Sequence, residues 1–318
     1  MTRTFGHNEW GLILGGSSGF GLATAHKLAR HGMNLCLVHR DRRGAMVRIE
    51  PEFDRIRSTG VSLLTFNADA LDPGSRATIL DQLGQTLAAG GRVRVLLHSV
   101  AFGNLKLIAP SKKAAEPPSA AARQALAAAL GVDAERLNAR VDSLLEEGLD
   151  AFHTLTSAPV YGTSFIDDED LGRTIYSMGT SLLAWTQEVL GRGLFAEDAR
   201  VFGLTSEGNE VAWKGYAAVA AAKVALESIV RSMAVELAPY GIRANVIQAG
   251  ITDTPALRAI PGNNLLKAQA RLRNPFHRLT TPQDIANMVY LLSLDEAAWV
   301  NGSLIRVDGG EHISGGMP

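Results

Sequence analysis

Short, almost wholly apolar runs alternate along the chain with longer amphipathic stretches. Seven of these runs have the length and character of strands that are buried on both faces. They are residues 10–16, 34–40, 61–69, 92–99, 198–206, 242–250 and 302–310. Helical patterns separate them, such as residues 21–32 and 73–89, and the helical stretch between the second and third runs should break near Pro51. The alternation predicts an α/β fold with a Rossmann-type, doubly wound parallel sheet of about seven strands.

Residues 104–150 interrupt this rhythm after the fourth predicted strand. An Ala-rich run with strong helix propensity begins at Pro117 and Pro118, Gly131 interrupts it, and Asp133 can cap a second helix. One face of that second helix carries Leu137, Val141, Leu144 and Leu145. The pattern predicts a helical hairpin inserted into the fold. It is either a surface excursion or oligomer contact, or a flap over a ligand site, since it leaves the carboxyl end of a central strand.

Composition narrows the class of protein. The 318 residues are 46% hydrophobic with a formal net charge of −1, so no global charge favours nucleic acid or an anionic membrane. The single cysteine, Cys36, can form no internal disulfide. No apolar stretch approaches the ~20 residues of a membrane span, and the N-terminus lacks a signal-peptide core. We expect a soluble cytoplasmic protein, with no metal site because the eight histidines lack ligand spacing.

The glycine-rich stretch LGGSSGFG, residues 14–21, joins the first predicted strand to the first helix. Glycines at 15, 19 and 21 permit a tight turn and a close approach of backbone amides to a pyrophosphate at the helix N-terminus. A purely structural turn is the alternative, but the position between strand and helix favours a dinucleotide. Residues 1–318 are then one dinucleotide-binding and catalytic domain, with 104–150 as an insertion. The expected cofactor contacts in this loop are Gly15, Ser17, Ser18, Gly19, Phe20 and Gly21.

The end of the second strand bears on the choice of cofactor. It reads HRDRR, in which Arg40, Arg42 and Arg43 can clamp a 2′-phosphate. Asp41 could instead face a ribose hydroxyl, as in NAD-selective sites. NADPH is therefore favoured and NADH remains possible. Asp69 and Ala70, after the third strand, should lie near the adenine.

A tyrosine and a lysine in the stretch KGYAAVAAAK carry the strongest chemical signal. Tyr216 and Lys223 are seven positions apart, which on an α-helix is about 700° of rotation and roughly 10 Å of rise, so both face one side. Together with the glycine loop and VDGG at 307–310, this pair resembles the short-chain dehydrogenase/reductase superfamily over nearly the whole chain except 104–150. Most members have three residues between the tyrosine and the lysine. This chain has six residues between them, and that spacing resembles the one in the branch of enoyl-acyl-carrier-protein reductases.

Further stretches are similar to the same branch. HSVAF, residues 98–102, resembles its fourth-strand end and implies cofactor contacts from Ser99, Val100 and Ala101; we assign His98 no chemistry. Met178 stands where most superfamily members place a catalytic asparagine. The stretch AGITDTPALRAIPG, 249–262, resembles the loop over the nicotinamide in the NADPH-using bacterial subtype. It implies that Thr252 and Thr254 lie near the carboxamide and diphosphate.

The resemblance implies NAD(P)H-dependent reduction of the 2,3-double bond of trans-2-enoyl thioesters in fatty-acid elongation. Tyr216 would hydrogen-bond the thioester oxygen, Lys223 would bind the nicotinamide ribose, and Ser206 could assist. Many enoyl reductases have an aromatic residue at the position of Ser206, and serine there is typical of carbonyl reductases. An NADP-dependent carbonyl or 3-oxoacyl reductase is therefore one alternative. A non-catalytic NADP(H)-binding protein is the other.

The resemblance also implies partners. The substrate would be an acyl thioester on acyl carrier protein or coenzyme A. Acidic carriers could dock on Lys112 and Lys113 or on Arg271 and Arg273, although solvated surface charge is the favoured explanation for each pair. A homotetramer or homodimer would pack through about 168–192 and 214–238.

Overall fold

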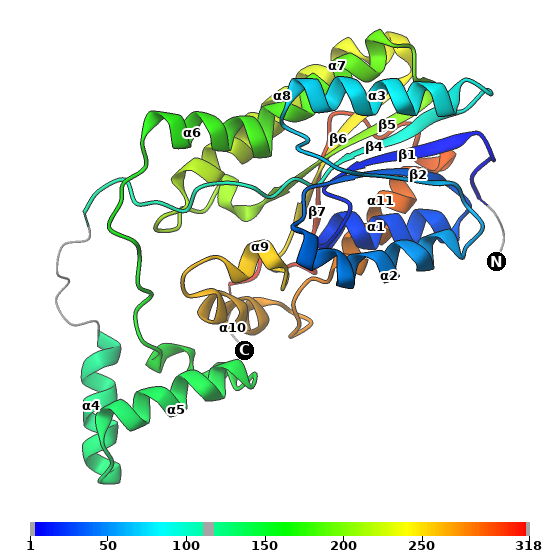
Figure 1. Ribbon diagram of the computed structural model, residues 1–318. Coiled ribbons are helices and arrows are strands. Elements are labelled where there is room, and N and C mark those ends of the chain that lie inside the picture. The colour runs from blue at the N-terminus through cyan, green and yellow to red at the C-terminus, as the bar shows by residue number, and fades with distance from the viewer. Residues whose placement is uncertain (1–3, 111–117, 316–318) are drawn as a thin grey trace.

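One parallel sheet forms the centre of the molecule (Figure 1). The structure is a computed structural model that describes residues 4–110 and 118–315. Within these ranges seven strands pair in the order β3-β2-β1-β4-β5-β6-β7, all parallel. They are β1 (Glu9–Leu14), β2 (Asn34–His39), β3 (Leu63–Asn67), β4 (Arg92–His98), β5 (Phe195–Ser206), β6 (Ile242–Ala249) and β7 (Leu304–Val307). The predicted Rossmann-type fold is confirmed, with every strand at its expected place.

Helices cover both faces of the sheet (Figure 1). One face carries α1 (Gly19–Arg30), α2 (Met46–Arg57) and α11 (Pro282–Leu292), and the other carries α3 (Pro73–Leu87), α7 (Ser181–Gly191) and α8 (Ala217–Glu236). Side chains of β1 alternate between these layers: Leu12 and Leu14 pack with α3, α7 and α8, whereas Ile13 packs with α1, α2 and α11. Because both faces are buried, the strands read as continuous apolar runs.

The carboxyl ends of the strands lie at one edge of the sheet. Leu14 of β1 pairs with His98 of β4, and Ser206 of β5 pairs with Ala249 of β6. The sheet order reverses between β1 and β4, so the loops that follow these two strands part and leave an opening. The segments after β1, β4, β5 and β6 therefore converge on this opening.

An ion cluster ties the central strands together near their amino ends. Asp198 of β5 accepts hydrogen bonds from Arg94 of β4 at 2.7 Å, from its own strand's Arg200 and from Arg243 of β6. Arg200 is fully buried and also donates to the Leu292 carbonyl at 3.2 Å, at the end of α11. The cluster fixes three strands and a helix relative to one another, on the side away from the opening.

The expected break at Pro51 is wrong, since α2 runs unbroken from Met46 to Arg57. Proline removes one helical hydrogen-bond donor, but Pro51 is solvent-exposed, so water can satisfy the carbonyl it leaves. The opposite face of α2 buries Ile49, Phe53 and Ile56 in the core. That burial holds the helix together through the proline.

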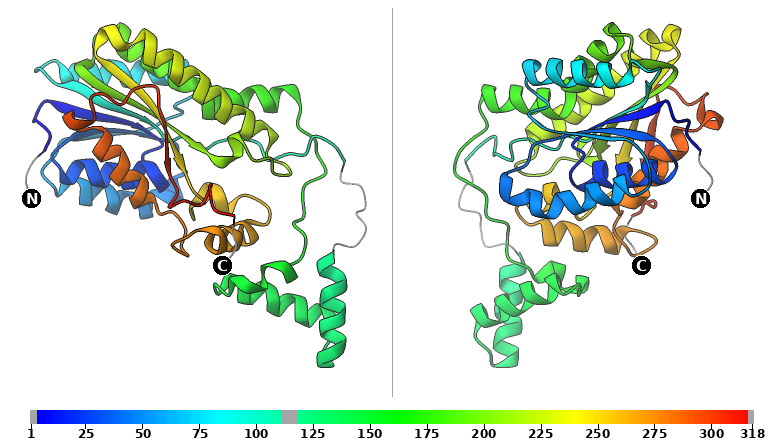
Figure 2. Two further views of the ribbon diagram at one scale, coloured as in Figure 1. Left: turned by 180° about the vertical axis from the view of Figure 1, so that it is seen from behind. Right: turned by 45° about the vertical axis from the view of Figure 1, so that its right-hand side comes forward.

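The predicted hairpin is confirmed as α4 (Pro118–Leu130) and α5 (Ala134–Glu146). Gly131 turns the chain with φ +64°, and the Asp133 carboxylate caps α5 by accepting from the Arg136 amide at 3.0 Å. The hairpin stands away from the sheet and lies beside α10 (Asn263–Arg273), which follows the short α9 (Pro255–Arg258) (Figure 2). Lys112, Lys113 and Pro117 lie outside the described residues.

None of the helices in the described ranges has the length and apolar character needed to cross a membrane.

Candidate active site

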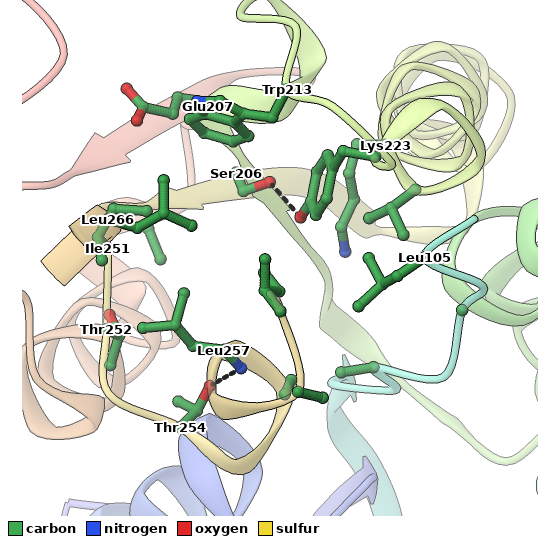
Figure 3. Close-up of a pocket in the computed structure, with 18 of the residues that line it drawn as sticks. Leu105, Ser206, Glu207, Trp213, Lys223, Ile251, Thr252, Thr254, Leu257 and Leu266 are labelled. Atoms are coloured by element: carbon green, nitrogen blue, oxygen red, sulfur yellow. Dashed lines mark hydrogen bonds between the residues drawn. The ribbon is translucent and has the colours of Figure 1, made fainter. Parts of the chain in front are cut away.

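A cavity of about 410 Å³ opens at the carboxyl edge of the sheet, within the size range of small-ligand sites. Segments after β4, β5 and β6 line it, together with the start of α8 and the helices α9 and α10. Figure 3 shows Ser206 and Lys223 on one side of this space and Thr254 and Leu257 on the opposite side. Most of the lining is apolar, so the few polar groups decide what chemistry can occur.

Ser206, Tyr216 and Lys223 meet at one wall of the cavity. Ser206 is the last residue of β5, and Tyr216 directly precedes the first turn of α8. The Ser206 and Tyr216 hydroxyls are 3.5 Å apart. Lys223 follows two turns along α8, and its ammonium donates to the Leu204 carbonyl at 2.8 Å. The seven-position spacing therefore places both side chains on the face of α8 that borders the cavity.

Burial sets the protonation of this pair. It raises the pKa of Tyr216, and the hydrogen bond with Ser206 opposes that shift only in part. It also lowers the pKa of Lys223 to about 8, against the opposing charge of Glu227. Desolvation disfavours the charged form of each group. At neutral pH the wall thus presents a protonated phenol, able to donate, next to an ammonium that is still mostly charged.

The Tyr216 ring is held by two neighbours that come shortly before it in the chain. Trp213 packs edge-to-face against it, with ring centroids 5.5 Å apart and an interplanar angle of 80°. Gly208 lies so close that a Cβ there would come within 2.4 Å of the ring. The segment between β5 and α8 therefore orients the phenol toward the cavity.

The glycine loop leaves no room for side chains where the backbone turns. A Cβ on Gly15 would lie 2.3 Å from the Ser99 carbonyl oxygen, and one on Gly21 would lie 2.1 Å from the Gly15 carbonyl oxygen. Gly15 also has φ +86°, in the left-handed region. The resulting cradle of backbone at the start of α1 fits a dinucleotide pyrophosphate. Across from it, the Thr254 methyl lies 3.7 Å from the Cβ position of Gly19.

The ends of β2 and β3 hold an arginine next to this loop. Arg40 donates to the Asp69 carboxylate at 2.6 Å and lies over the Phe102 ring at 5.5 Å from its centroid. It remains more than half exposed, so a ligand can reach it. Asp41 instead lies 2.9 Å from the His39 imidazole. The alternative in which Asp41 faces a ribose is therefore disfavoured by this geometry.

His98 and Met178 have ordinary packing roles in this arrangement. His98 is buried and its Nε2 lies 2.8 Å from the Ser181 hydroxyl. Burial, with Lys223 nearby, lowers the pKa of His98 to about 3, so it is neutral. Met178 lies in one turn of π-helix, residues Tyr176–Thr180, and lines the cavity. A thioether is only a weak acceptor and cannot organise a proton-relay water.

The structure brings many of the predicted site residues to the cavity wall. These are Phe20, Ser99, Val100, Ala101, Ser206, Tyr216, Lys223, Thr252 and Thr254. The others follow β1, β2 and β3 along the same edge of the sheet, beside the cavity: Gly15, Ser17, Ser18, Gly19, Gly21, Arg40, Asp69 and Ala70. Two of the predicted polar groups are engaged locally. Thr252 donates to the Gly250 carbonyl, and Thr254 caps α9.

Several lining residues had no sequence signal. Pro159 and Tyr161 come from the segment returning from the hairpin, and Leu266 and Gln269 come from α10. The first pair lies in irregular chain, where no periodicity indicates which side chains face a pocket. Trp213 was within reach of prediction, because it lies three positions before Tyr216.

Arg271 and Arg273, suggested as a docking patch, are instead used within the chain. Arg271 pairs with Asp150 at 2.5 Å, and Arg273 pairs with Glu207 and Glu311 at 2.7 and 2.9 Å. Both side chains are half-buried, so the geometry offers little free charge to a carrier.

The chain is similar to known oxidoreductases. A family model described as enoyl-(acyl carrier protein) reductase matches residues 133–312. The enoyl-[acyl-carrier-protein] reductase [NADH] FabI of Aquifex aeolicus is 35% identical over 135 residues, which is 42% of this chain and 50% of the relative. The cis-4-hydroxycyclohexanecarboxylate dehydrogenase of Sinomonas cyclohexanicum is 31% identical over 120 residues, or 38% and 45%. These matches thus span about half the length of the curated relatives.

A solved structure supports the fold over the full length. The short-chain dehydrogenase from Burkholderia cenocepacia in complex with NADP superimposes with a TM-score of 0.67 at 18% identity, covering 98% of this chain and 100% of that chain. At that identity the likeness concerns the fold alone.

Gly21→Ala should weaken binding of a nicotinamide dinucleotide at least tenfold, because its Cβ must displace the Gly15 carbonyl and open the cradle. The measurement is the NADPH dissociation constant by fluorescence titration. Gly191→Ala at the end of α7 is the matched control, since a Cβ there meets nothing within 4 Å. Equal affinities for the two variants would contradict the assignment of the loop.

Proposed function

The chain belongs to the enoyl-(acyl carrier protein) reductase family of short-chain dehydrogenases/reductases, and on that premise we propose that it reduces the 2,3-double bond of trans-2-enoyl thioesters. The observation that carries the proposal is the meeting of Ser206, Tyr216 and Lys223 on the wall of an otherwise largely apolar cavity. An enoyl thioester has matching chemistry: one polar carbonyl and an apolar tail.

Tyr216, Lys223 and Ser206 have different roles in the proposed reaction. The Tyr216 hydroxyl donates a hydrogen bond to the thioester oxygen, where negative charge develops during reduction. Burial favours this role because it keeps the phenol protonated. The Lys223 ammonium adds positive potential and would hold the ribose of the cofactor. Ser206, 3.5 Å from Tyr216, orients the phenol or shares the thioester oxygen.

A nicotinamide dinucleotide supplies the hydride when it is bound. The backbone at Gly15 and Gly21 would hold its pyrophosphate, and Thr254 at the start of α9 would close over it from the other side. Ser99, Val100 and Ala101 would line the path between the two ends of the cofactor.

NADPH is the proposed form of the cofactor. Arg40 is exposed at the end of β2 and already orders one carboxylate, Asp69, so a 2′-phosphate could replace or join that partner. The FabI relative from Aquifex aeolicus carries NADH in its name, which makes NADH the competing cofactor. Arg42 and Arg43, both exposed, are available to strengthen a phosphate clamp.

Carbonyl reduction is the second candidate. The Ser206–Tyr216 contact would suit a substrate carbonyl that becomes an alkoxide, and one of the relatives is named as a dehydrogenase of a hydroxy acid. Met178 opposes this candidate, because it cannot hold a relay water. The proposed carrier of the acyl group is an acyl carrier protein or coenzyme A, and the proposed role is fatty-acid biosynthesis in the cytoplasm. We further propose assembly as a homotetramer or homodimer through α6 (Asp168–Ile175), α7 and α8.

The reaction is tested by following NADPH oxidation at 340 nm with a 2-enoyl and a 3-oxoacyl thioester of equal length. We expect turnover of the enoyl substrate, with the oxo substrate at least 100-fold slower. Turnover of the oxo substrate alone would replace this proposal with carbonyl reduction.

Tyr216→Phe should lower kcat by about 10²–10⁴-fold, which is the usual contribution of a positioned acid. NADPH affinity should stay unchanged, because the hydroxyl serves the substrate. Tyr240→Phe, at an exposed tyrosine after α8, is the control. Steady-state kinetics give kcat, and NADPH titration gives the cofactor affinity, for both variants. Near-normal turnover of Tyr216→Phe would show that the phenol is not the catalytic hydrogen-bond donor.

Arg40→Ala should raise the KM for NADPH by about 10- to 100-fold, in line with the loss of a charged hydrogen bond, and leave that for NADH within about twofold. Arg48→Ala on the exposed side of α2 removes an equal charge without touching the site. A parallel change of both KM values in Arg40→Ala would argue against a 2′-phosphate contact.

A further inference from the structure

The segment that returns from the inserted hairpin to α6 forms part of the cavity wall. We call residues 156–167 the return arm. Its Pro159 and Tyr161 line the same cavity as Tyr216 and Lys223, although they lie more than 50 positions earlier in the chain. The excursion of the chain away from the sheet therefore extends past residue 150, the end expected from the sequence, and its return arm borders the cavity, while α4 and α5 stand farther away (Figure 2).

Close packing holds the arm in place. A Cβ on Gly215 would lie 3.2 Å from the Tyr161 ring, and the Lys214 ammonium lies 5.1 Å from the centroid of that ring. A Cβ on Gly262 would lie 2.5 Å from the Pro159 ring. The arm is thus wedged between the residue that precedes Tyr216 and the residue that precedes α10.

The end of α5 and the segment after it also contact α10, another part of the cavity wall. The Asp150 carboxylate, just after α5, accepts two hydrogen bonds from the Arg271 guanidinium at 2.6 and 2.5 Å. Asn264 donates to Glu146 of α5 at 3.2 Å. Both partners belong to α10, the helix that presents Leu266 and Gln269 to the cavity. The excursion therefore packs against two parts of the cavity lining, the segment before Tyr216 and the helix α10.

An apolar tail attached to the thioester has two directions open to it. One leads along the return arm, past Leu105, Pro159, Tyr161, Ile260 and Leu265. The other passes Trp213 and Gln269 into an adjoining cavity of about 870 Å³. That second space is bordered by Glu207, Arg273, His153 and His277. Burying methylenes beside the Glu207–Arg273 ion pair costs that pair hydration, so the first direction is favoured.

We propose that the return arm is the specificity-determining wall for the acyl tail, and that the Tyr161 ring sets the tail length beyond which further methylenes are no longer buried. The inference rests on the proposed enoyl thioester substrate. The Tyr161 ring is half-buried, which suits a side chain that ends a channel, and burial raises the pKa of its phenol, so it stays neutral toward an apolar tail.

The test is a ladder of N-acetylcysteamine thioesters from four to twelve carbons. Dissociation constants of the saturated acyl thioesters are measured by calorimetry in the presence of NADP⁺, and kcat/KM is measured for the matching 2-enoyl thioesters. In the unaltered protein, affinity should rise up to about fourfold per buried methylene and then level off. Tyr161→Ala should move that plateau to chains at least two carbons longer.

Matched variants separate size from other effects. Tyr161→Phe keeps the ring and should keep the plateau, and Tyr161→Leu should shift it by less than Tyr161→Ala and guards against poor folding of the latter. Tyr240→Ala, at an exposed site, should change nothing. A plateau that stays in place in Tyr161→Ala and Tyr161→Leu overturns the inference. So does a plateau that moves only in Gln269→Ala, which would place the tail in the adjoining cavity.

The binding ladder does not depend on turnover. If no enoyl thioester is reduced by the unaltered protein, the proposed function fails. A plateau that still moves with Tyr161 would then support the arm as an acyl-binding wall, and binding without any dependence on length would overturn it.

Discussion

The crowding of backbone atoms where β1 and β4 part governs the carboxyl edge of the sheet. Gly15 packs against the Ser99 carbonyl and Gly21 packs against Gly15, with no space for a side chain at either glycine. Because the backbone segments pack this closely, the amide groups at the start of α1 face the opening between the diverging loops. The cavity beyond it depends on that placement, because Ser99, Val100 and Ala101 continue directly from the crowded point to its wall.

Desolvation shifts the pKa values of the two titratable groups on the cavity wall, Tyr216 and Lys223. The same burial that keeps the Tyr216 phenol protonated lowers the pKa of Lys223 to about 8, a cost to the ammonium on the order of 3 kcal/mol. The Leu204 carbonyl and the Glu227 charge retain enough stabilisation for the lysine to stay mostly protonated at neutral pH. A neutral donor and a weakly hydrated cation side by side suit a reaction in which negative charge develops on a substrate oxygen.

The inserted segment and its return arm contribute residues and contacts to the cavity wall. Its helices lie beside α10 and away from the sheet, yet its return arm reaches the cavity at Tyr161 and its Asp150 anchors α10 through Arg271. The sequence left two interpretations of residues 104–150 open, a surface excursion or oligomer contact and a flap, and both stay predictions. In the structure α4 and α5 lie away from the sheet, and the return arm that follows them borders the pocket.

The parallel sheet, the glycine loop and the Tyr216–Lys223 face of α8 could be predicted from the amino-acid sequence, because each depends on a repeat or spacing within a short stretch of chain. The helix break expected at Pro51 was wrong, because packing of Phe53 in the core stabilises α2 despite the proline. The contacts of Asp150 with Arg271 and of Tyr161 with Gly215 become visible only in the folded chain. Those contacts join residues more than 50 positions apart in the chain, and a local periodicity does not determine which distant side chains meet.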